Sequence, residues 1–285
     1  RVKGSTSEET SWVSLDINNV DAVNQVIQKV QPTHVIHLAA ISHVPTSFKN
    51  PVATWQTNVF GTLNLLQAIK TYCGDAFFLF VSSSEVYGDS FKVERPLSEE
   101  AKLQPMNPYA ASKAAAELAV GQYFRQSGLG VIARPFNHIG PGQSPEFVTA
   151  SFAQQIAMIE ANMQPAVLRV GNLEAQRDFL DVRDVCSAYL KLLELSTVEL
   201  TTLDERTFNV ASGRPQAIAG VLDILLKQSG CSIAVEQDAE RMWPSDIALA
   251  AGNSDKLYAA TGWQPQYDLK HTLKNVLDYW REQVK

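Results

Sequence analysis

The stretch from Asp21 to Ala40, DAVNQVIQKVQPTHVIHLAA, contains the pattern that decides the fold. Its first half, Asp21 to Lys29, has apolar residues at helical spacing, and Pro32 separates it from the apolar run His34 to Ala40. These residues predict a helix followed by a buried strand. Trp12 to Ile17 precedes the helix and has the β-branched and aromatic content of a short strand, so we expect a β-α-β unit.

Helices and strands continue to alternate along the chain. The apolar patterns predict helices over 51–70 and 108–125, and strands over 77–81 and 131–135. This alternation indicates the α/β class, with a doubly wound parallel sheet of the Rossmann type whose ligands bind beyond the carboxyl ends of the strands. After residue 137 the expected elements are shorter, in the order helix 147–161, strand 167–170, helix 182–194, strand 207–211, helix 218–228, strand 232–236 and helix 269–283.

We expect two parts along the chain. Residues 1–137 are interpreted as a dinucleotide-binding domain, and residues 138–285 as mainly a substrate-binding lobe with some segments returning to the Rossmann sheet. A complete fold of this type opens with a strand and a glycine-rich loop that holds the cofactor pyrophosphate. Gly4 is the only glycine before Trp12, and no strand pattern precedes Trp12. We therefore expect the first β-α segment to be absent from this chain by truncation, which leaves the choice between NAD and NADP open.

Composition narrows the class of protein. The 285 residues are 45% hydrophobic and 19% charged, which is typical of a globular protein. A formal charge of −6 argues against a nucleic-acid partner, because binding to phosphates needs a basic face. The three cysteines are far apart, so we expect neither a metal site nor a disulfide framework, and a reducing cytoplasm is favoured. Apolar runs such as 77–81 are too short to span a membrane.

Tyr109 and Lys113 lie in the stretch NPYAASK, where Asn107 can cap a helix and Pro108 suits its first position. The i, i+4 spacing places the ammonium group near the phenol, and a nearby positive charge lowers the pKa of a tyrosine from about 10. Such a phenol can donate a proton near neutral pH. Chance pairing of a tyrosine and a lysine on one helix face is the alternative, and it is common.

A run of three serines follows the apolar strand at 77–81, in the stretch VSSSEVYG. Ser83 would lie at the edge of the sheet where ligands bind, and its hydroxyl could hold a carbonyl oxygen together with the phenol of Tyr109. This arrangement suits the reduction of a carbonyl group. Serines can also end a strand by bonding to the local backbone, and on their own they favour neither interpretation.

Together, SSSEVYG at 82–88, NPYAASK at 107–113 and RPFNH at 134–138 resemble the extended short-chain dehydrogenase/reductases that act on nucleotide-activated sugars. The resemblance covers the whole chain. Further stretches, among them IGPGQ at 139–143, GNLEA at 171–175 and DFLDV at 178–182, are similar to GDP-4-keto-6-deoxy-D-mannose reductases, which form GDP-D-rhamnose. The related GDP-mannose 4,6-dehydratases typically differ at these places.

The resemblance implies a nicotinamide cofactor, NADPH or NADH, and a set of residues that contact it. Catalysis would fall to Ser83, Tyr109 and Lys113, with Glu85 beside them. The residues implied at the cofactor are Asp16, Ile17, Leu38, Ala39, Ala40, Asn58, Tyr109, Lys113 and Pro135. Asp16 could instead cap a loop, and the alanines could serve helix packing.

The same resemblance implies a substrate site for a GDP-linked sugar. Asn137 and Arg177 would approach the diphosphate, and Val148 would border the guanine. The residues implied at the substrate are Ser84, Asn137, Val148, Asn172, Arg177 and Arg241. The residues alone favour an ion pair of Arg177 with Asp178 or Asp181. Relatives often have an arginine directly before Pro244, where this chain has Trp243, so either Arg241 reaches the phosphate or Trp243 stacks on the nucleotide.

Three functions follow from these features. The first is the reduction of the 4-keto group of a nucleotide-linked 6-deoxyhexose, most closely GDP-4-keto-6-deoxy-D-mannose to GDP-D-rhamnose. The second is GDP-mannose 4,6-dehydration, in which a carboxylate at the place of Glu85 assists the loss of water. The third is a sensor or scaffold without catalysis. The resemblance also implies a homodimer formed by the helices near Pro51 and Pro108, to which Leu63, Leu66, Leu118 and Ala119 could contribute. Packing in the core explains the same residues.

Overall fold

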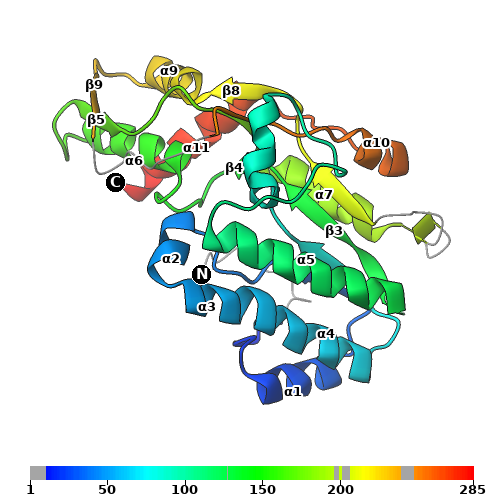
Figure 1. The fold of residues 1–285 in the computed structure, drawn as a ribbon. Coiled ribbons are helices and arrows are strands. Elements are labelled where there is room, and N and C mark those ends of the chain that lie inside the picture. Colours follow the sequence, from blue (N-terminus) through cyan, green and yellow to red (C-terminus); the bar gives the residue numbers. More distant parts are fainter. Residues whose placement is uncertain (1–10, 127, 196–198, 201–205, 239–246) are drawn as a thin grey trace. The chain divides into compact units, whose positions relative to one another are not determined.

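The computed structural model divides the chain into two compact units, and each is described by itself. Unit 1 comprises Arg1–Phe80 and Asn107–Gly130, and unit 2 comprises Val81–Met106 and Val131–Lys285. The structure describes residues 11–126, 128–195, 199–200, 206–238 and 247–285 (Figure 1).

Unit 1 consists of helices around two parallel strands. Its described elements are α1 (Val20–Val30), β1 (His34–His37), α2 (Val44–Lys49), α3 (Pro51–Trp55), the π-helical turn η1 (Gln56–Phe60), α4 (Gly61–Tyr72), β2 (Phe77–Val81, whose last residue begins unit 2) and α5 (Pro108–Gln126). The side chain of Asn19 caps α1 by accepting a hydrogen bond from the Ala22 amide, and the helix buries Val23 and Ile27. α1 packs beside α4, and α5 packs beside α3 and α4 (Figure 1).

The strand expected at Trp12 to Ile17 is wrong, because this segment has no regular secondary structure. Trp12 and Val13 are 77% and 59% exposed. Among the residues that the structure describes, no strand pairs with this segment. A strand needs a partner for its backbone groups, so β-branched and aromatic content alone does not produce one.

Unit 2 begins with a 3₁₀ segment and continues with shorter strands and helices. Its described elements are η2 (Ser84–Val93), β3 (Leu129–Pro135, whose first two residues belong to unit 1), β4 (Asn137–Ile139), α6 (Val148–Glu160), β5 (Val167–Val170), β6 (Gln176–Asp181), α7 (Val182–Leu193), β7 (Thr207–Val210), β8 (Pro215–Ala217), α9 (Ile218–Gln228), β9 (Ala234–Gln237), β10 (Leu249–Ala250), α10 (Asp255–Thr261) and α11 (Leu269–Gln283). Most of these fall where the apolar patterns predicted them, while η2, β4, β6, β8, β10 and α10 were not expected.

The described strands form a parallel main sheet of four strands, a second sheet of four strands and a third of two. In the main sheet the order is β1-β2-β3-β7, with β1 parallel to β2 and β3 parallel to β7. A second sheet has the order β10-β6-β4, and β8 runs antiparallel to β6. The third consists of β5 and β9. The predicted α/β class with a parallel sheet of the Rossmann type is confirmed.

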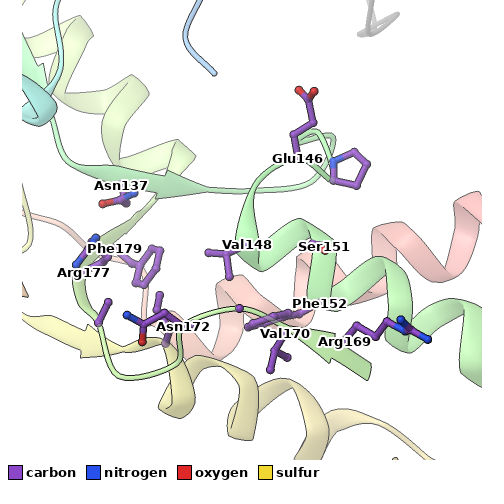
Figure 2. A pocket seen from close by; sticks show the side chains of 14 residues that line it. Asn137, Glu146, Val148, Ser151, Phe152, Arg169, Val170, Asn172, Arg177 and Phe179 are labelled. Carbon is purple, nitrogen blue, oxygen red and sulfur yellow. The ribbon is translucent and has the colours of Figure 1, made fainter. Parts of the chain in front are cut away.

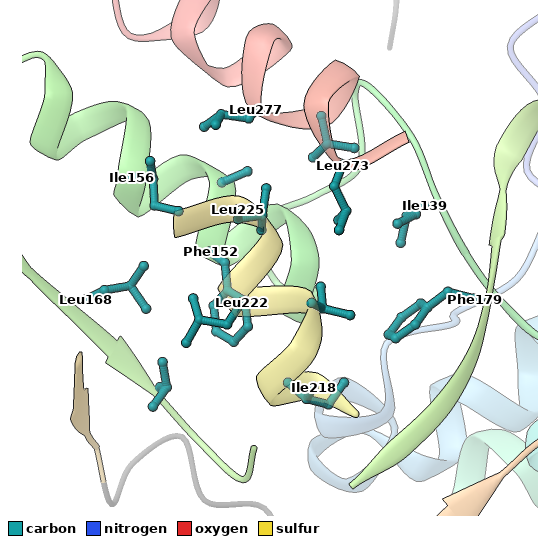
Figure 3. Packing of buried hydrophobic residues seen from close by; sticks show 14 of the residues in the cluster. Ile139, Phe152, Ile156, Leu168, Phe179, Ile218, Leu222, Leu225, Leu273 and Leu277 are labelled. Atoms are coloured by element: carbon teal, nitrogen blue, oxygen red, sulfur yellow. The ribbon is translucent and has the colours of Figure 1, made fainter. Parts of the chain in front are cut away.

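The core of unit 2 lies where α6, α9 and α11 meet, as Figure 3 shows. Phe152 from α6, Leu222 from α9 and Leu273 from α11 are each no more than 2% exposed. Replacing a buried leucine of this kind by alanine typically costs about 2–5 kcal/mol. Arg281 of α11 joins the same helices at the surface, since its guanidinium group contacts the carboxylate of Glu160 in α6 at 2.6 Å. This core supports the segments that carry the pocket described below.

Candidate functional site

The predicted catalytic residues are divided between the two units. Tyr109 and Lys113 belong to unit 1, and Ser83 and Glu85 belong to unit 2. The first pair lies at the start of a long helix, and the second pair lies directly after a buried strand. Each pair is therefore built from the residues of its own unit.

Tyr109 and Lys113 lie in the first turns of α5. The helix begins there because the side-chain oxygen of Asn107 accepts a hydrogen bond from the Ala110 amide at 2.7 Å, and Pro108 needs no amide partner at the first helical position. Both side chains are buried, with 8% of Tyr109 and 3% of Lys113 exposed. The expected capping and shared helix face are therefore present in the structure.

The ammonium group of Lys113 lies in an apolar setting. Its nitrogen lies 4.9 Å from the centre of the Phe80 ring, a distance typical of a cation-π contact. Burial lowers the pKa of Lys113 to about 8, and the charge of Glu117 on the next turn opposes this shift. A lysine with this pKa is charged at neutral pH but close to losing its proton, which suits a group that tunes a neighbouring acid.

Asn58 fixes the position of the first turns of α5. It lies in η1 and is buried. Its amide nitrogen donates to the Ile41 carbonyl at 3.0 Å and to the hydroxyl of Ser112 at 2.9 Å, while its side-chain oxygen accepts from the Ile41 amide at 2.8 Å. Ser112 in turn donates to the Tyr109 carbonyl at 2.7 Å. Asn58 therefore ties the loop after β1 to the turn that carries the tyrosine, and π-turns of this kind often occur at functional sites.

Three of the residues predicted at the cofactor, Leu38, Ala39 and Ala40, directly follow β1. Leu38 and Ala39 follow this strand and are exposed, although Leu38 is a large apolar residue. Asp16 is exposed, and its carboxylate accepts a hydrogen bond from the Asn18 amide at 2.9 Å, so it does cap a local turn. Ile17 packs against Gly61, where an added Cβ would lie 2.6 Å from the Ile17 side chain. An alanine at this position would therefore displace Ile17.

Ser83 and Glu85 lie at the start of η2 in unit 2. Ser83 caps this segment, because its hydroxyl oxygen accepts a hydrogen bond from the Glu85 amide at 3.2 Å. The local backbone contact that the serine run suggested is therefore present. An oxygen that accepts one hydrogen bond can still donate its own hydrogen, so this contact is compatible with a catalytic role. Ser82 and Ser84 are also buried, and Glu85 is half-buried.

A buried polar network holds the rest of η2 in place. The hydroxyl of Tyr87 donates to the side-chain oxygen of Asn209 at 2.7 Å and accepts from Arg134 at 2.9 Å. The next residue, Gly88, has φ +47°, and a Cβ there would lie 1.9 Å from the Gln104 carbonyl oxygen. This turn therefore requires glycine. The network and the turn therefore hold the part of η2 that follows Glu85.

A pocket of about 310 Å³ lies within unit 2, and Figure 2 shows its lining. Four of the six residues predicted at the substrate line it, namely Asn137, Val148, Asn172 and Arg177. The lining also includes Pro145, Glu146, Ser151, Phe152, Arg169, Val170, Gly171, Ala175, Phe179 and Ile218. Ser84 is not among the lining residues, and Arg241 lies outside the described residues. Pro135 ends β3, where it is buried.

Arg177 is held in this pocket by backbone carbonyls. Its guanidinium group donates to the carbonyls of Gln176 at 2.8 Å and Ile247 at 3.1 Å. Burial lowers the pKa of Arg177, and the negative charge of Glu85 opposes this shift. The guanidinium group nevertheless remains charged at all physiological pH values. Arg177 therefore provides a permanent positive charge in a pocket of mixed polarity.

The two aspartates considered as partners of Arg177 bond to other groups. The carboxylate of Asp178 is fully buried and accepts hydrogen bonds from the hydroxyl and amide of Ser212 and from the amides of Gly213 and Gly252, at 2.5–3.2 Å. Asp181 accepts from Arg183 and from the hydroxyl of Thr272, both at 2.7 Å. Asp178 thus fixes the strand beside Arg177 to two distant loops.

Sequence reasoning missed several of the pocket residues. Ser151 and Phe152 follow Val148 by three and four positions in α6, so helical spacing from Val148 could have identified them. Arg169 lies in β5 and has no sequence motif of its own. In the described part of the chain, no group of three or more histidine, cysteine or acidic residues could hold a metal ion, and none of the described helices has the length and apolar character needed to cross a membrane.

The parallel sheet and the Tyr109-x-x-x-Lys113 pair define an extended short-chain dehydrogenase/reductase. The sequence profile described as GDP-mannose 4,6 dehydratase matches residues 1–276, and the chain belongs to this family. It is 41% identical to a GDP-6-deoxy-D-mannose reductase from Pseudomonas aeruginosa over 89% of this chain and 82% of that protein. The structure resembles RMD from Pseudomonas aeruginosa complexed with NADPH, with TM-score 0.86, 38% identity, and coverage of 95% of this chain and 88% of the other.

A second similar structure is the UDP-glucose 4-epimerase of Thermus thermophilus in complex with NAD. Its TM-score is 0.79, its identity 30%, and the match covers 94% of this chain and 83% of that one. The proteins similar to this chain therefore include one whose structure contains NADPH and an epimerase whose structure contains NAD.

Proposed function

We propose that this protein reduces the 4-keto group of a nucleotide-linked 6-deoxyhexose, and that the natural reaction converts GDP-4-keto-6-deoxy-D-mannose to GDP-D-rhamnose. The observation that carries the proposal is the buried pair of Tyr109 and Lys113 at the start of α5, with the pKa of Lys113 lowered to about 8 by burial. The 41% identity to a GDP-6-deoxy-D-mannose reductase supports this choice of substrate.

The residues at the end of β1 fit a nicotinamide dinucleotide. Leu38 offers an exposed apolar surface, and Ala39 and Ala40 are small enough for a ligand to approach the backbone. We assign Asp16, Ile17, the segment 38–40, Asn58 and Pro135 to this binding site. Bound NADPH or NADH would supply the hydride for C4 of the sugar.

The catalytic roles follow from the chemistry of three side chains. The phenol of Tyr109 donates its proton to the oxygen at C4, so that one hydride and one proton convert the carbonyl to a hydroxyl group. The ammonium group of Lys113 stabilises the phenolate that remains. The hydroxyl of Ser83 donates a hydrogen bond to the same sugar oxygen, which favours the negative charge that develops there.

The pocket of unit 2 would bind the nucleotide part of the substrate. Arg177 would pair with a phosphate oxygen, Asn137 would contact the diphosphate, and Val148 would border the base. Ser84, Asn172 and Arg241 belong to the same proposal. Residues 1–137 would then bind mainly the cofactor and residues 138–285 mainly the substrate.

The test uses the purified protein with GDP-4-keto-6-deoxy-D-mannose. We expect one equivalent of NADPH or NADH to be oxidised for each GDP-D-rhamnose formed, and comparison of the two cofactors gives the preference. GDP-mannose should give no 4-keto product. Absence of keto-sugar-dependent oxidation with both cofactors would refute the reductase assignment.

The second candidate is a GDP-mannose 4,6-dehydratase. Glu85 supports it, because this half-buried carboxylate follows Ser83 directly after β2 and could assist the loss of water. Formation of a 4-keto product from GDP-mannose without net consumption of reduced cofactor would establish this activity. A Glu85→Gln variant would then lose the activity, whereas a reductase would largely keep it.

We also propose that the protein is a homodimer joined through the helices of unit 1. Leu118 on α5 is 70% exposed and Leu63 on α4 is 41% exposed, so both can contact a second copy. Leu66 is buried within unit 1 and contributes to its core instead. Sedimentation equilibrium should give twice the mass of the chain, and Leu118→Glu should shift the equilibrium towards monomer.

The cysteines support a reducing compartment, and we propose the cytoplasm. Cys73, Cys186 and Cys231 are all free thiols in the structure, and the last two are exposed. Exposed thiols persist where glutathione keeps them reduced. Cell fractionation with an antibody against the protein would test this location.

A further inference from the structure

His37 is a buried histidine beneath the catalytic lysine, and the proposed reaction gives it no role. It ends β1 and is 3% exposed. The centre of its ring lies 5.8 Å from the centre of the Phe80 ring. Phe80 is also the ring beneath the ammonium group of Lys113. His37, Phe80 and Lys113 therefore belong to one buried cluster in unit 1.

The hydrogen bonds of Thr62 fix the tautomer of His37. The Thr62 hydroxyl donates its single hydrogen to the Asn58 carbonyl at 2.7 Å. The same oxygen lies 2.9 Å from Nε2 of His37, so it must accept at this contact and His37 must donate. The imidazole ring is therefore protonated on Nε2. Through Thr62, His37 supports the π-helical turn η1 that contains Asn58. Asn58 holds the start of α5.

We propose that His37 is a positioning residue for Lys113. Its neutral ring supports Phe80 directly and Asn58 through Thr62, and it places no second positive charge near the ammonium group. This inference rests on the proposed function, because the lysine matters only if Tyr109 donates a proton. His37 itself touches neither substrate nor the reacting atoms in this scheme.

The electrostatics of the cluster agree with this role. Burial and, to a smaller extent, the charge of Lys113 lower the pKa of His37 to about 3. The ring therefore stays neutral throughout the pH range in which Lys113 titrates. A protonated histidine at this position would repel the ammonium group and favour its neutral form.

The other titratable groups around Lys113 lie on α5 itself and on the elements packed against it. Glu117 is on α5 itself, and its charge favours the ammonium form. His43 directly precedes α2 and contacts Thr46, and Lys49 at the end of α2 is exposed. On α4, Lys70 contacts Gln126 at the far end of α5, and Tyr72 is at the end of the helix. β2 contributes Phe80, whereas α3 and η1 contain no titratable residue.

The test measures the titration of Lys113 directly, by NMR of protein with ¹³C-labelled lysine, and also the pH dependence of kcat. His37→Gln keeps a neutral donor for Thr62, and we expect a midpoint for Lys113 close to that of the wild type. His37→Leu has a similar volume but no polar group, so the midpoint and the alkaline limb of kcat should both move to lower pH by about half a unit or more. We expect kcat itself to fall about tenfold.

His34→Leu is the matched control, because His34 lies on the same strand but is exposed and contacts Thr33. His34→Leu should shift neither the titration midpoint of Lys113 nor the alkaline limb of the kcat–pH profile. If His37→Leu does not fold, Thr62→Val breaks the same contact with little change in shape and should shift the midpoint in the same direction. A midpoint that is unchanged in whichever of these two variants folds, or a His37→Gln variant shifted as far as the leucine variant, would overturn the proposal.

The NMR titration does not depend on turnover. Failure of the reductase assignment would appear separately, as a wild-type protein that does not oxidise reduced cofactor with the keto sugar. The ¹⁵N spectrum of the His37 ring adds a second check, since it should show the neutral Nε2-protonated form at about pH 5, above the pKa of about 3. A charged ring or the other tautomer at that pH would contradict the proposal.

Discussion

Lys113 in unit 1 is a buried cation and Arg177 in unit 2 is a half-buried one, and they are held in different ways. Lys113 lies over the Phe80 ring, and burial brings its pKa to about 8. Arg177 donates to two backbone carbonyls; burial lowers its pKa, and an arginine keeps its charge at physiological pH. The lysine can respond to a proton transfer, whereas the arginine provides constant charge. Unit 1 therefore suits proton chemistry, and unit 2 suits recognition of an anion.

Replacement of the proposed proton donor should have the largest effect. Tyr109→Phe keeps the ring in its buried position but removes the hydroxyl group, and we expect kcat to fall by about 10³–10⁴ with little change in KM. Tyr123→Phe is the matched control, because Tyr123 is also a buried tyrosine of α5. Equal turnover of Tyr109→Phe and the wild type, measured by NADPH absorbance, would exclude the proposed mechanism.

Lys113→Met should affect activity and stability in opposite directions. The pKa of Lys113 is lowered from 10.5 to about 8 in the folded protein. The unfolded chain therefore binds this proton more tightly, so stability rises as pH increases between these two values, and the charged lysine destabilises the fold at pH 7. We expect the free energy of unfolding at pH 7 to increase by up to roughly 3 kcal/mol, and kcat to fall by about 10²–10³.

Urea unfolding at pH 7 and near pH 10 measures this effect. The gain from Lys113→Met should be largest at pH 7 and smaller near pH 10, where the wild-type lysine is already neutral in the fold. Lys70→Met is a suitable control, since Lys70 is exposed at the far end of α4. A gain that does not depend on pH would show that packing, and not the lysine charge, is responsible.

Arg177→Lys should weaken substrate binding more than catalysis. A lysine keeps the positive charge but cannot donate two parallel hydrogen bonds to a phosphate. We expect KM for the nucleotide sugar to rise about 10–100-fold, with kcat changed less than about threefold. Arg183→Lys, which alters the ion pair with Asp181 outside the pocket, should leave KM near the wild-type value. A large loss of kcat with unchanged KM would show that Arg177 acts in the chemical step and not in substrate recognition.

Val148→Ala should have the smallest effect. Val148 begins α6, lines the pocket and is 38% exposed, so only part of its apolar surface can contact a ligand. We expect KM to rise about two- to fivefold, in line with the loss of two methyl groups from a partly buried contact. Isothermal titration with GDP measures the loss of binding affinity directly. An unchanged affinity would show that the base does not contact Val148.

The sequence predicted those elements whose pattern is local. α1, β2 and α5 follow from helical spacing, an apolar run and a capped start, and each was expected within a few residues. The strand predicted at Trp12 to Ile17 was wrong because a strand needs a partner strand, and local residue content does not reveal one. β6 was missed for a related reason.

β6 contains Asp178 and Asp181, whose charges are unusual in a buried strand. Much of the hydrogen bonding that stabilises their burial comes from Ser212, Gly252 and Thr272, in distant parts of the chain. In the candidate site, the motif identified Tyr109 and Lys113 as a pair. The position of His37 beneath Lys113 depends on the Phe80 ring that both side chains contact, and no local pattern gives this arrangement.

The carboxylate of Asp178 also has a consequence for the order of folding. It joins a strand to residues 34 and 74 positions further along the chain, through Ser212 and Gly252. Contacts of such sequence separation form late, because the loops between them must first be closed. We therefore expect the wall of the pocket that carries Arg177 to be completed only after the segments of Ser212 and Gly252 have joined it. A chain cut before Gly252 would lose one of the donors that hold this wall, even though every residue lining the pocket would still be present.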